Sequence, residues 1–248
     1  MLKLRFEGMN PVFISKAHRW LGIVAALQLF IWTGSGLFFA VIPIDAIRGF
    51  HLVETPASFR LGYVRLIPPS SLVRENKELA MVSLDQVRIT QRLNTPIYLI
   101  ETKEKTWVFN AETAERLAPL TEDEANIVAS NSTNLPLRSV TWVEAVEPGS
   151  EYRDGNLPAW KVELDSSDHA VLWIDANSGE VRAVRTRTWR IYDFLWSLHI
   201  MDYQGRDNFN SWLLRGFALL GVVTIVSGVI MFVLTRRRKR RSSRSRAA

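Results

Sequence analysis

Two long apolar stretches lie near the two ends of the chain, and a polar region with an alternating pattern separates them. The first runs without a charged residue from Leu21 to Ile44, and the second from Gly216 to Thr235. Each is long enough to cross a hydrocarbon core of about 30 Å as a helix. The pattern therefore predicts two transmembrane helices with a folded domain between them.

The region between these stretches alternates apolar and polar residues on both sides of short polar turns, which is the pattern of β-hairpins. One such unit runs from Pro96 to Leu117 and another from Pro158 to Val181. Each begins with proline and an aromatic-rich strand, returns as a second strand, and ends in a tight turn, NAETAE or DANSGE. We expect the same hairpin to occur twice.

Helix signals accompany the hairpins. Ser83 is a candidate N-cap for a helix that would continue to Leu93, and Thr121 with Glu124 forms a candidate capping box for a second helix. A further strand is expected from Ser139 to Val146. The predicted fold class is therefore membrane α+β, with two transmembrane helices flanking a central domain of two helix-plus-antiparallel-sheet units.

Basic residues predict the orientation of the chain. The first 19 residues hold four Lys and Arg against one Glu, and the 13 residues after the second stretch hold eight against none. Of 31 basic and 25 acidic residues, 19 and 24 remain for the rest, a net charge of −5. Because short basic flanks stay in the cytoplasm, we expect both termini inside and the central domain outside. The run RRRKRR follows a span directly, so we interpret it as a topological signal and expect no nucleic-acid partner.

The first apolar stretch is expected to be a retained anchor rather than a cleaved signal peptide. It exceeds the usual apolar core of about 7–15 residues, and no A-x-A site follows it. The chain has no cysteine, which excludes disulfides, iron–sulfur ligation and covalent c-type haem attachment.

Three segments together resemble a known family. The hairpin WKVELDSSDHAVLWIDANSGEV, with its closing turn, resembles the PepSY domain. The stretch KAHRWLGIVAALQLFIWTGSGLFF resembles the first helix of PepSY-associated transmembrane proteins, with histidine near its start and Ser-Gly near its end. The segment FLWSLHIMDYQGRDNFNSWLLRGFALLGVVTIVSGVIMFV resembles the other family helix in the same two respects. The resemblance covers nearly the whole chain.

The resemblance implies an envelope protein of the bacterial inner membrane. PepSY modules are associated with peptidase propeptides and with inhibition or binding outside the membrane. Larger transmembrane members resemble inner-membrane reductases of ferric-siderophore uptake that carry b-type haem on membrane histidines. Those proteins have four spans whereas this chain has two, so a complete electron path within one protomer is not expected.

Three histidines are candidate haem ligands. His18 precedes the first span and is expected on the cytoplasmic side. His199 precedes the second span and His51 follows the first, so both are expected on the outer side. The predicted topology separates His18 from His199 by about the thickness of a bilayer. A haem b would therefore need histidines from two protomers, from a partner subunit, or from His51 together with His199. Alternatively, His18 is simply an interfacial side chain.

Aromatic residues surround His199 at helical spacing: Trp189, Tyr192, Trp196 and Tyr203. Such a face could bind a haem, a quinone or a flavin. It is equally typical of a helix at the lipid headgroups, or of a packing seam. His169, in the polar turn DSSDHA, is expected to be a solvated turn residue, with a surface metal site on Asp165 and Asp168 as the alternative.

Chemistry within the spans has little support in the sequence. No Asp, Glu, Lys or Arg lies deep in either span, and Thr224 and Gly228 form a small-residue pair suited to close helix packing. Signatures of metalloproteases, serine hydrolases and nucleotide-binding loops are missing. We expect no catalytic activity of the chain on its own, and no metal site.

The favoured function is a PepSY-type accessory protein of the inner membrane, whose periplasmic domain binds a partner and supports a redox or iron-uptake complex. The alternatives are a haem-bearing electron-transfer subunit that works as a dimer or with a partner, and a membrane-tethered peptidase regulator. The expected partners are the lipid bilayer and either a second copy or another membrane protein. The expected segments are a cytoplasmic N-terminus (1–19), the first span (20–44), two PepSY-like units (45–118 and 119–187), an aromatic interfacial helix or linker (188–211), the second span (212–235) and a basic cytoplasmic tail (236–248).

Overall fold

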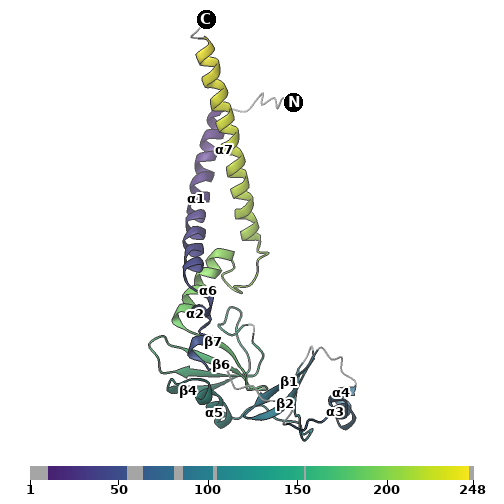
Figure 1. Cartoon of the computed structure of the whole chain (residues 1–248). Coiled ribbons are helices and arrows are strands. Elements are labelled where there is room, and N and C mark those ends of the chain that lie inside the picture. The colour runs from purple at the N-terminus through teal and green to yellow at the C-terminus, as the bar shows by residue number, and fades with distance from the viewer. Residues whose placement is uncertain (1–10, 55–63, 81–85, 103–104, 154, 246–248) are drawn as a thin grey trace. The chain divides into compact units, whose positions relative to one another are not determined.

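The computed structural model describes residues 11–54, 64–80, 86–102, 105–153 and 155–245, which form two units (Figure 1). The helical unit combines residues up to Val41 with those from Asp193 onward, and the central unit spans Ile42–Tyr192. The helices are α1 (Pro11–Val41), α2 (Ile44–Arg48), the 3-10 helix η1 (Phe50–Leu52), α3 (Pro69–Glu75), α4 (Lys77–Ala80), α5 (Glu122–Ser132), α6 (Arg187–Ile200) and α7 (Trp212–Ser245). The strands are β1 (Gln86–Arg92), β2 (Thr95–Glu101), β3 (Thr106–Asn110), β4 (Leu137–Val143), β5 (Ala159–Leu164), β6 (Val171–Asp175) and β7 (Val181–Arg185).

In the helical unit, α1 packs against α7, and both helices are long and apolar enough to span a membrane, over Ser15–Val41 and Trp212–Val233. The less exposed residues of each helix recur at spacings of three and four, which is the seam pattern of a two-helix coil. The α1 seam is His18, Leu21, Ala25, Gln28, Trp32, Ser35 and Phe39, and the α7 seam is Leu213, Phe217, Leu220, Thr224, Ser227 and Met231. The remaining faces carry large exposed apolar side chains such as Phe30 and Ile225, as a helix in lipid requires.

The helices α6 and α7 are separate. The helix α6 ends at Ile200, and the next residue, Met201, has a positive φ of 55°. The Asp202 carboxylate accepts backbone N–H bonds from Gly205, Asp207 and Asn208 in the connection. These bonds lower the pKa of Asp202, and the one from Asn208 has the largest effect. Together they outweigh the desolvation of the carboxylate, which would raise the pKa.

The central unit contains two antiparallel sheets, one of order β1-β2-β3 and one of order β4-β5-β6-β7. The fold class predicted from the sequence, with two apolar helices flanking an α+β region of two antiparallel sheets, is confirmed. The first sheet buries Tyr98 and Phe109 with Leu72 of α3 and Leu79 of α4. The second sheet buries one face, including Leu172, against α5, whose predicted capping box is present.

The two sheets contain the same hairpin twice, as the sequence predicts. In the first copy the Asn110 side chain accepts the backbone N–H of Glu112, and in the second the Asp175 side chain accepts that of Asn177. The backbone bonds match as well, because the N–H of Ala111 reaches Pro96 O and that of Ala176 reaches Pro158 O. Each turn therefore closes on its own aspartate or asparagine side chain.

The prediction of a helix from Ser83 to Leu93 is wrong. Residues 86–92 form β1, while Ser83 lies outside the described residues. The strand turns into β2 through Leu93 and Asn94, both at positive φ, which is the geometry of a tight two-residue hairpin. Pairing of every β1 residue with β2 outweighs the weak helical pattern of this segment.

Ion pairs join β1 to the second hairpin. Arg88 donates to both oxygens of Glu180, at 2.7 and 3.1 Å, and Thr90 donates to the same carboxylate. The nearly buried Arg92 donates to Ala118 O and to Glu124 of the capping box. Burial alone would raise the pKa values of Glu180 and Glu124. The bonds from Arg88 and Thr90 to Glu180, and those from the Thr121 backbone N–H and from Arg92 to Glu124, outweigh burial, so both pKa values are lowered.

We expect the stability of the central unit to fall in acid. A carboxylate whose pKa is lowered in the folded state stabilises that state above its unfolded pKa, which for Glu is about 4.5, and loses this effect as the pH falls through the folded value. Near-UV circular dichroism of the full chain in detergent should therefore show a Tm that declines below that pH. Glu180→Gln should lower the Tm at neutral pH and flatten the decline. Equal pH dependence in Glu180→Gln and wild type would contradict this account.

Candidate functional site

The histidine of α6 is fixed by the first transmembrane helix. His199 Nδ1 lies 2.8 Å from Ser35 Oγ, and the indole N–H of Trp32 donates to the backbone oxygen of His199 at 2.8 Å. Ser35 is 3 % exposed, so this contact is shielded from solvent. The end of α6 is thus joined to α1 through one side chain and one backbone group.

The hydrogen-bond partners of Ser35 bear on the tautomer of His199. The Ser35 hydroxyl lies 2.9 Å from Ile31 O and 3.1 Å from Trp32 O, both within α1. We expect its one proton to be donated within α1, so that the hydroxyl accepts from His199 and Nδ1 carries the imidazole proton. In the neutral imidazole Nε2 then keeps its lone pair, which is the form that ligates metals.

Aromatic rings surround the same imidazole. The ring centroids of Phe39, Trp32 and Trp196 lie 5.6, 6.2 and 6.4 Å from that of His199, and the Trp196 ring is parallel to it. Trp196 also packs on Phe209, and its indole N–H donates to Arg206 O. The surroundings of His199 are therefore aromatic and largely apolar, with rings at several different angles to the imidazole.

The other family histidine is held in the same way at the other end of the helix pair. His18 Nδ1 lies 2.7 Å from Ser227 Oγ, and the Ser227 hydroxyl donates to Thr224 O at 2.8 Å. By the same reasoning, we expect Nδ1 of His18 to be the donor and Nε2 to keep its lone pair. A Cβ at Gly228 would lie 3.3 Å from the His18 ring, so this glycine leaves room for the imidazole on α7.

The two histidines thus bond to the serines of the opposite Ser-Gly pairs, and each Ser-Gly pair lies late in its own span. Ser35 follows His18 by 17 residues on α1, which at about 1.5 Å per residue separates the two imidazoles by roughly 25 Å along the helix. One iron cannot bind both. His18 and His199 of one chain therefore cannot ligate a common centre.

The other candidate residues are dispersed. His51 is exposed on η1 and Tyr192 belongs to α6, both within the central unit. Tyr203 lies beyond the end of α6 and is exposed, so it does not continue the expected aromatic stripe. His169 is an exposed turn residue, and within the described ranges no cluster of three His, Asp or Glu side chains could hold a metal ion.

The two serines were not singled out as partners of the histidines in the sequence. They lie 164 and 209 residues from their histidines, so local spacing carries no sign of the contact. The detectable signal was the Ser-Gly pair in each span, since a hydroxyl in a membrane helix either bonds within its own helix or bonds a neighbour.

Comparison with known proteins identifies the chain. The family model described as the PepSY-associated TM region matches residues 15–248. The chain belongs to this family. No curated protein and no solved structure matches it. Membership agrees with the two membrane helices and confirms the resemblance inferred from the sequence.

We expect Ser35→Ala to free the His199 ring in this PepSY-associated protein. Without the hydroxyl acceptor, Nδ1 loses its bond, at a cost of about 1 kcal/mol in the unfolding free energy. Nitrogen-15 NMR of labelled imidazoles in detergent should change from one tautomer to a mixture for His199 while His18 stays unchanged. Thr235→Val is the matched control, because the Thr235 hydroxyl bonds within α7 alone. An unchanged His199 spectrum in Ser35→Ala would contradict the tautomer assignment.

Proposed function

We propose that this chain is an accessory protein of the bacterial inner membrane that works within a redox or iron-uptake complex, where a second protein chain completes its membrane site. Family membership supports the membrane setting. The observation that carries the proposal is a pair of half-sites, each a histidine whose Nδ1 lies within hydrogen-bond distance of a serine hydroxyl, so that Nε2 is the nitrogen we expect to be available to a ligand. One chain thus supplies two histidines that could each bind such a group, but they are too far apart to bind the same one.

The second chain is either another copy or a different membrane protein. Packing of α1 against α7 leaves broad apolar faces on both helices. Such faces contact lipid or a neighbouring helix with equal ease, since lipid tails are as apolar as leucine. A further helix at one of these faces would bring a metal-ligating side chain of its own to the same membrane depth as His199 or His18.

A b-type haem is the group that the half-sites favour. Bound haem supplies one-electron transfer at its iron. His199 or His18 would hold its iron through Nε2, and His51 remains a candidate at the outer side. The rings of Trp32, Phe39 and Trp196 would give a haem beside His199 an apolar, aromatic environment. The serine bonds would orient the ligands and raise their basicity, as outer-shell partners do in metal sites.

An absorption spectrum tests the haem proposal. Protein purified from haem-replete cells should show a Soret band and a reduced α-band. His199→Ala and His18→Ala should each remove roughly half of the absorbance if the two sites fill independently. His169→Ala is the matched control and should leave the spectrum unchanged. A colourless wild-type protein, or full absorbance in the double variant His18→Ala with His199→Ala, would contradict haem binding at these residues.

Native mass spectrometry of the same preparation identifies the second chain. A haem that travels with two copies supports the homodimer, and a haem that travels with one copy and a different polypeptide supports a hetero-complex. Monomeric wild-type chains with neither haem nor companion, prepared from native membranes in mild detergent, would contradict the accessory role as well.

We also propose that both termini are cytoplasmic and that the central unit is periplasmic, because the tails are basic and the region between them is acidic. The absence of native cysteine makes the test direct. A membrane-impermeant maleimide should label Ser167→Cys, an exposed position between β5 and β6, in cells with a permeabilised outer membrane. Ser245→Cys should be labelled only after the inner membrane is broken. The reverse pattern would overturn this orientation.

A further inference from the structure

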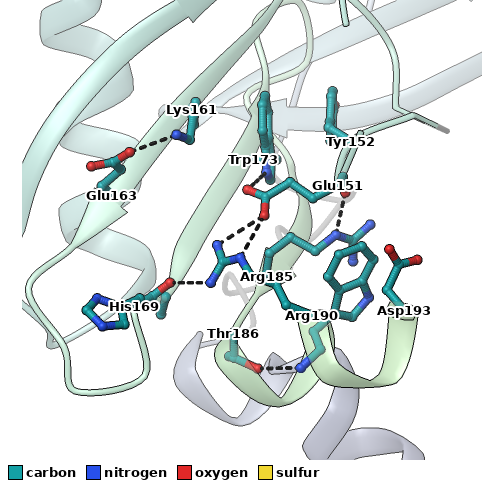
Figure 2. Close-up of polar contacts among 12 residues, drawn as sticks. Glu151, Tyr152, Lys161, Glu163, His169, Trp173, Arg185, Thr186, Arg190 and Asp193 are labelled. Atoms are coloured by element: carbon teal, nitrogen blue, oxygen red, sulfur yellow. Dashed lines mark hydrogen bonds and ion pairs between the residues drawn. The ribbon is translucent and has the colours of Figure 1, made fainter. Parts of the chain in front are cut away.

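An open cleft of about 550 Å³ lies in the central unit, on the face of the second sheet opposite α5. The side chains of Lys161 and Glu163 on β5 and of Trp173 on β6 line it (Figure 2). Residues before β5 cover the rest of this face, where Tyr152 stacks on Trp173 with centroids 4.5 Å apart. The volume is within the range of sites for small molecules.

The floor of the cleft is held by a polar network. The Glu151 carboxylate accepts from the Trp173 indole at 3.2 Å and from Arg190 at 3.0 and 3.1 Å. Arg190 also donates to the backbone oxygen of His169 at 2.9 Å, and Arg185 donates to that of Glu151 at 2.6 Å. Figure 2 shows this network linking α6, β7 and the turn before β6. A floor fixed by so many bonds needs little reorganisation when a ligand binds.

The charge of the lining differs from that of the chain around it. Three cationic side chains, Arg138, Lys161 and Arg190, line the cleft together with the imidazole of His169, against the two carboxylates of Glu151 and Glu163. The chain between the basic tails has a net charge of −5, so this excess of basic groups is local. Concentrated positive charge in a concave site attracts anions.

Two of the basic groups are available for exchange with a ligand. Arg138 pairs with Asp165, but both side chains are more than half exposed, and such pairs contribute little. Lys161 pairs with Glu163 at 2.7 Å, and both of these side chains are about one-third exposed. A ligand carboxylate or phosphate can take the place of Asp165 beside Arg138 or of Glu163 beside Lys161, because water already reaches both ion pairs.

We propose that this cleft binds a small polyanion that carries carboxylate or phosphate groups, with Arg138 and Lys161 as its contacts and the Glu151–Arg190 network as its floor. The inference goes beyond the proposed membrane function and does not depend on it, since each residue that carries it belongs to the central unit.

Glu163 gives the sharpest test, because it competes with the ligand for Lys161. The hydrogen bond and charge of Lys161 lower the pKa of Glu163, so this group is ionised at neutral pH. Glu163→Gln removes one negative charge from the lining and should tighten anion binding about two- to fivefold. Damage to the fold would weaken binding instead.

Isothermal titration calorimetry of the full chain in a detergent with neutral headgroups measures these effects, with citrate and inorganic pyrophosphate as probes and glycerol as the neutral control. Arg138→Gln and Lys161→Gln should each weaken binding about fivefold. Arg182→Gln on β7 is the matched control, since Arg182 pairs with Glu180 away from the cleft. The probe that binds more tightly identifies the preferred anionic group.

The absence of saturable binding by both probes would overturn the proposal. It would also be overturned if Arg182→Gln weakened binding as much as Lys161→Gln, or if Glu163→Gln weakened it. The absorption spectrum of the purified protein reports on the membrane histidines alone, so failure here is distinguishable from failure of the proposed function.

Discussion

The bonds between imidazole and serine determine the arrangement of the helical unit. Apolar side chains gain little by leaving lipid for a helix interface, so apolar contact alone does not align two spans. A polar group placed between the spans is costly unless it finds a partner, and this makes the pairing directional. His18 bonds to Ser227 and His199 bonds to Ser35, so α1 is tied to α7 near one end and to α6 near the other. The seam of small and apolar residues between these ties then packs in a single register.

The same bonds connect structure to chemistry. Each serine hydroxyl lies within hydrogen-bond distance of a backbone oxygen of its own helix as well as of the imidazole, and we expect this arrangement to keep the imidazole proton on Nδ1. A serine that holds two helices together would then also select which imidazole nitrogen remains available. The helices also separate the two imidazoles by far more than the span of one iron site. The packing of the helices and the separation of the two imidazoles both follow from one type of contact.

Local patterns in the sequence predicted the parts of the fold that depend on neighbours along the chain. The uncharged stretches, the period-two hairpins and the capping box at Thr121 each rest on residues close together in sequence. The helix expected up to Leu93 was wrong because cross-strand pairing of β1 decided the outcome. Only part of the candidate site could be predicted from the sequence. Its histidines stood out, whereas the serine partners, the end of α6 at Ile200 and the cleft depend on contacts across the fold.

The repeated hairpin has a consequence for how the central unit can change. Each turn closes on its own side chain, Asn110 in one copy and Asp175 in the other, so each copy holds its shape without help from its counterpart. The two copies can therefore have different roles in the central unit. Here the strand β1 beside the first copy supplies the arginines that anchor the pair, while the second presents the open polar face. The repeat thus places one hairpin beside the anchoring strand and leaves the other with an open polar surface.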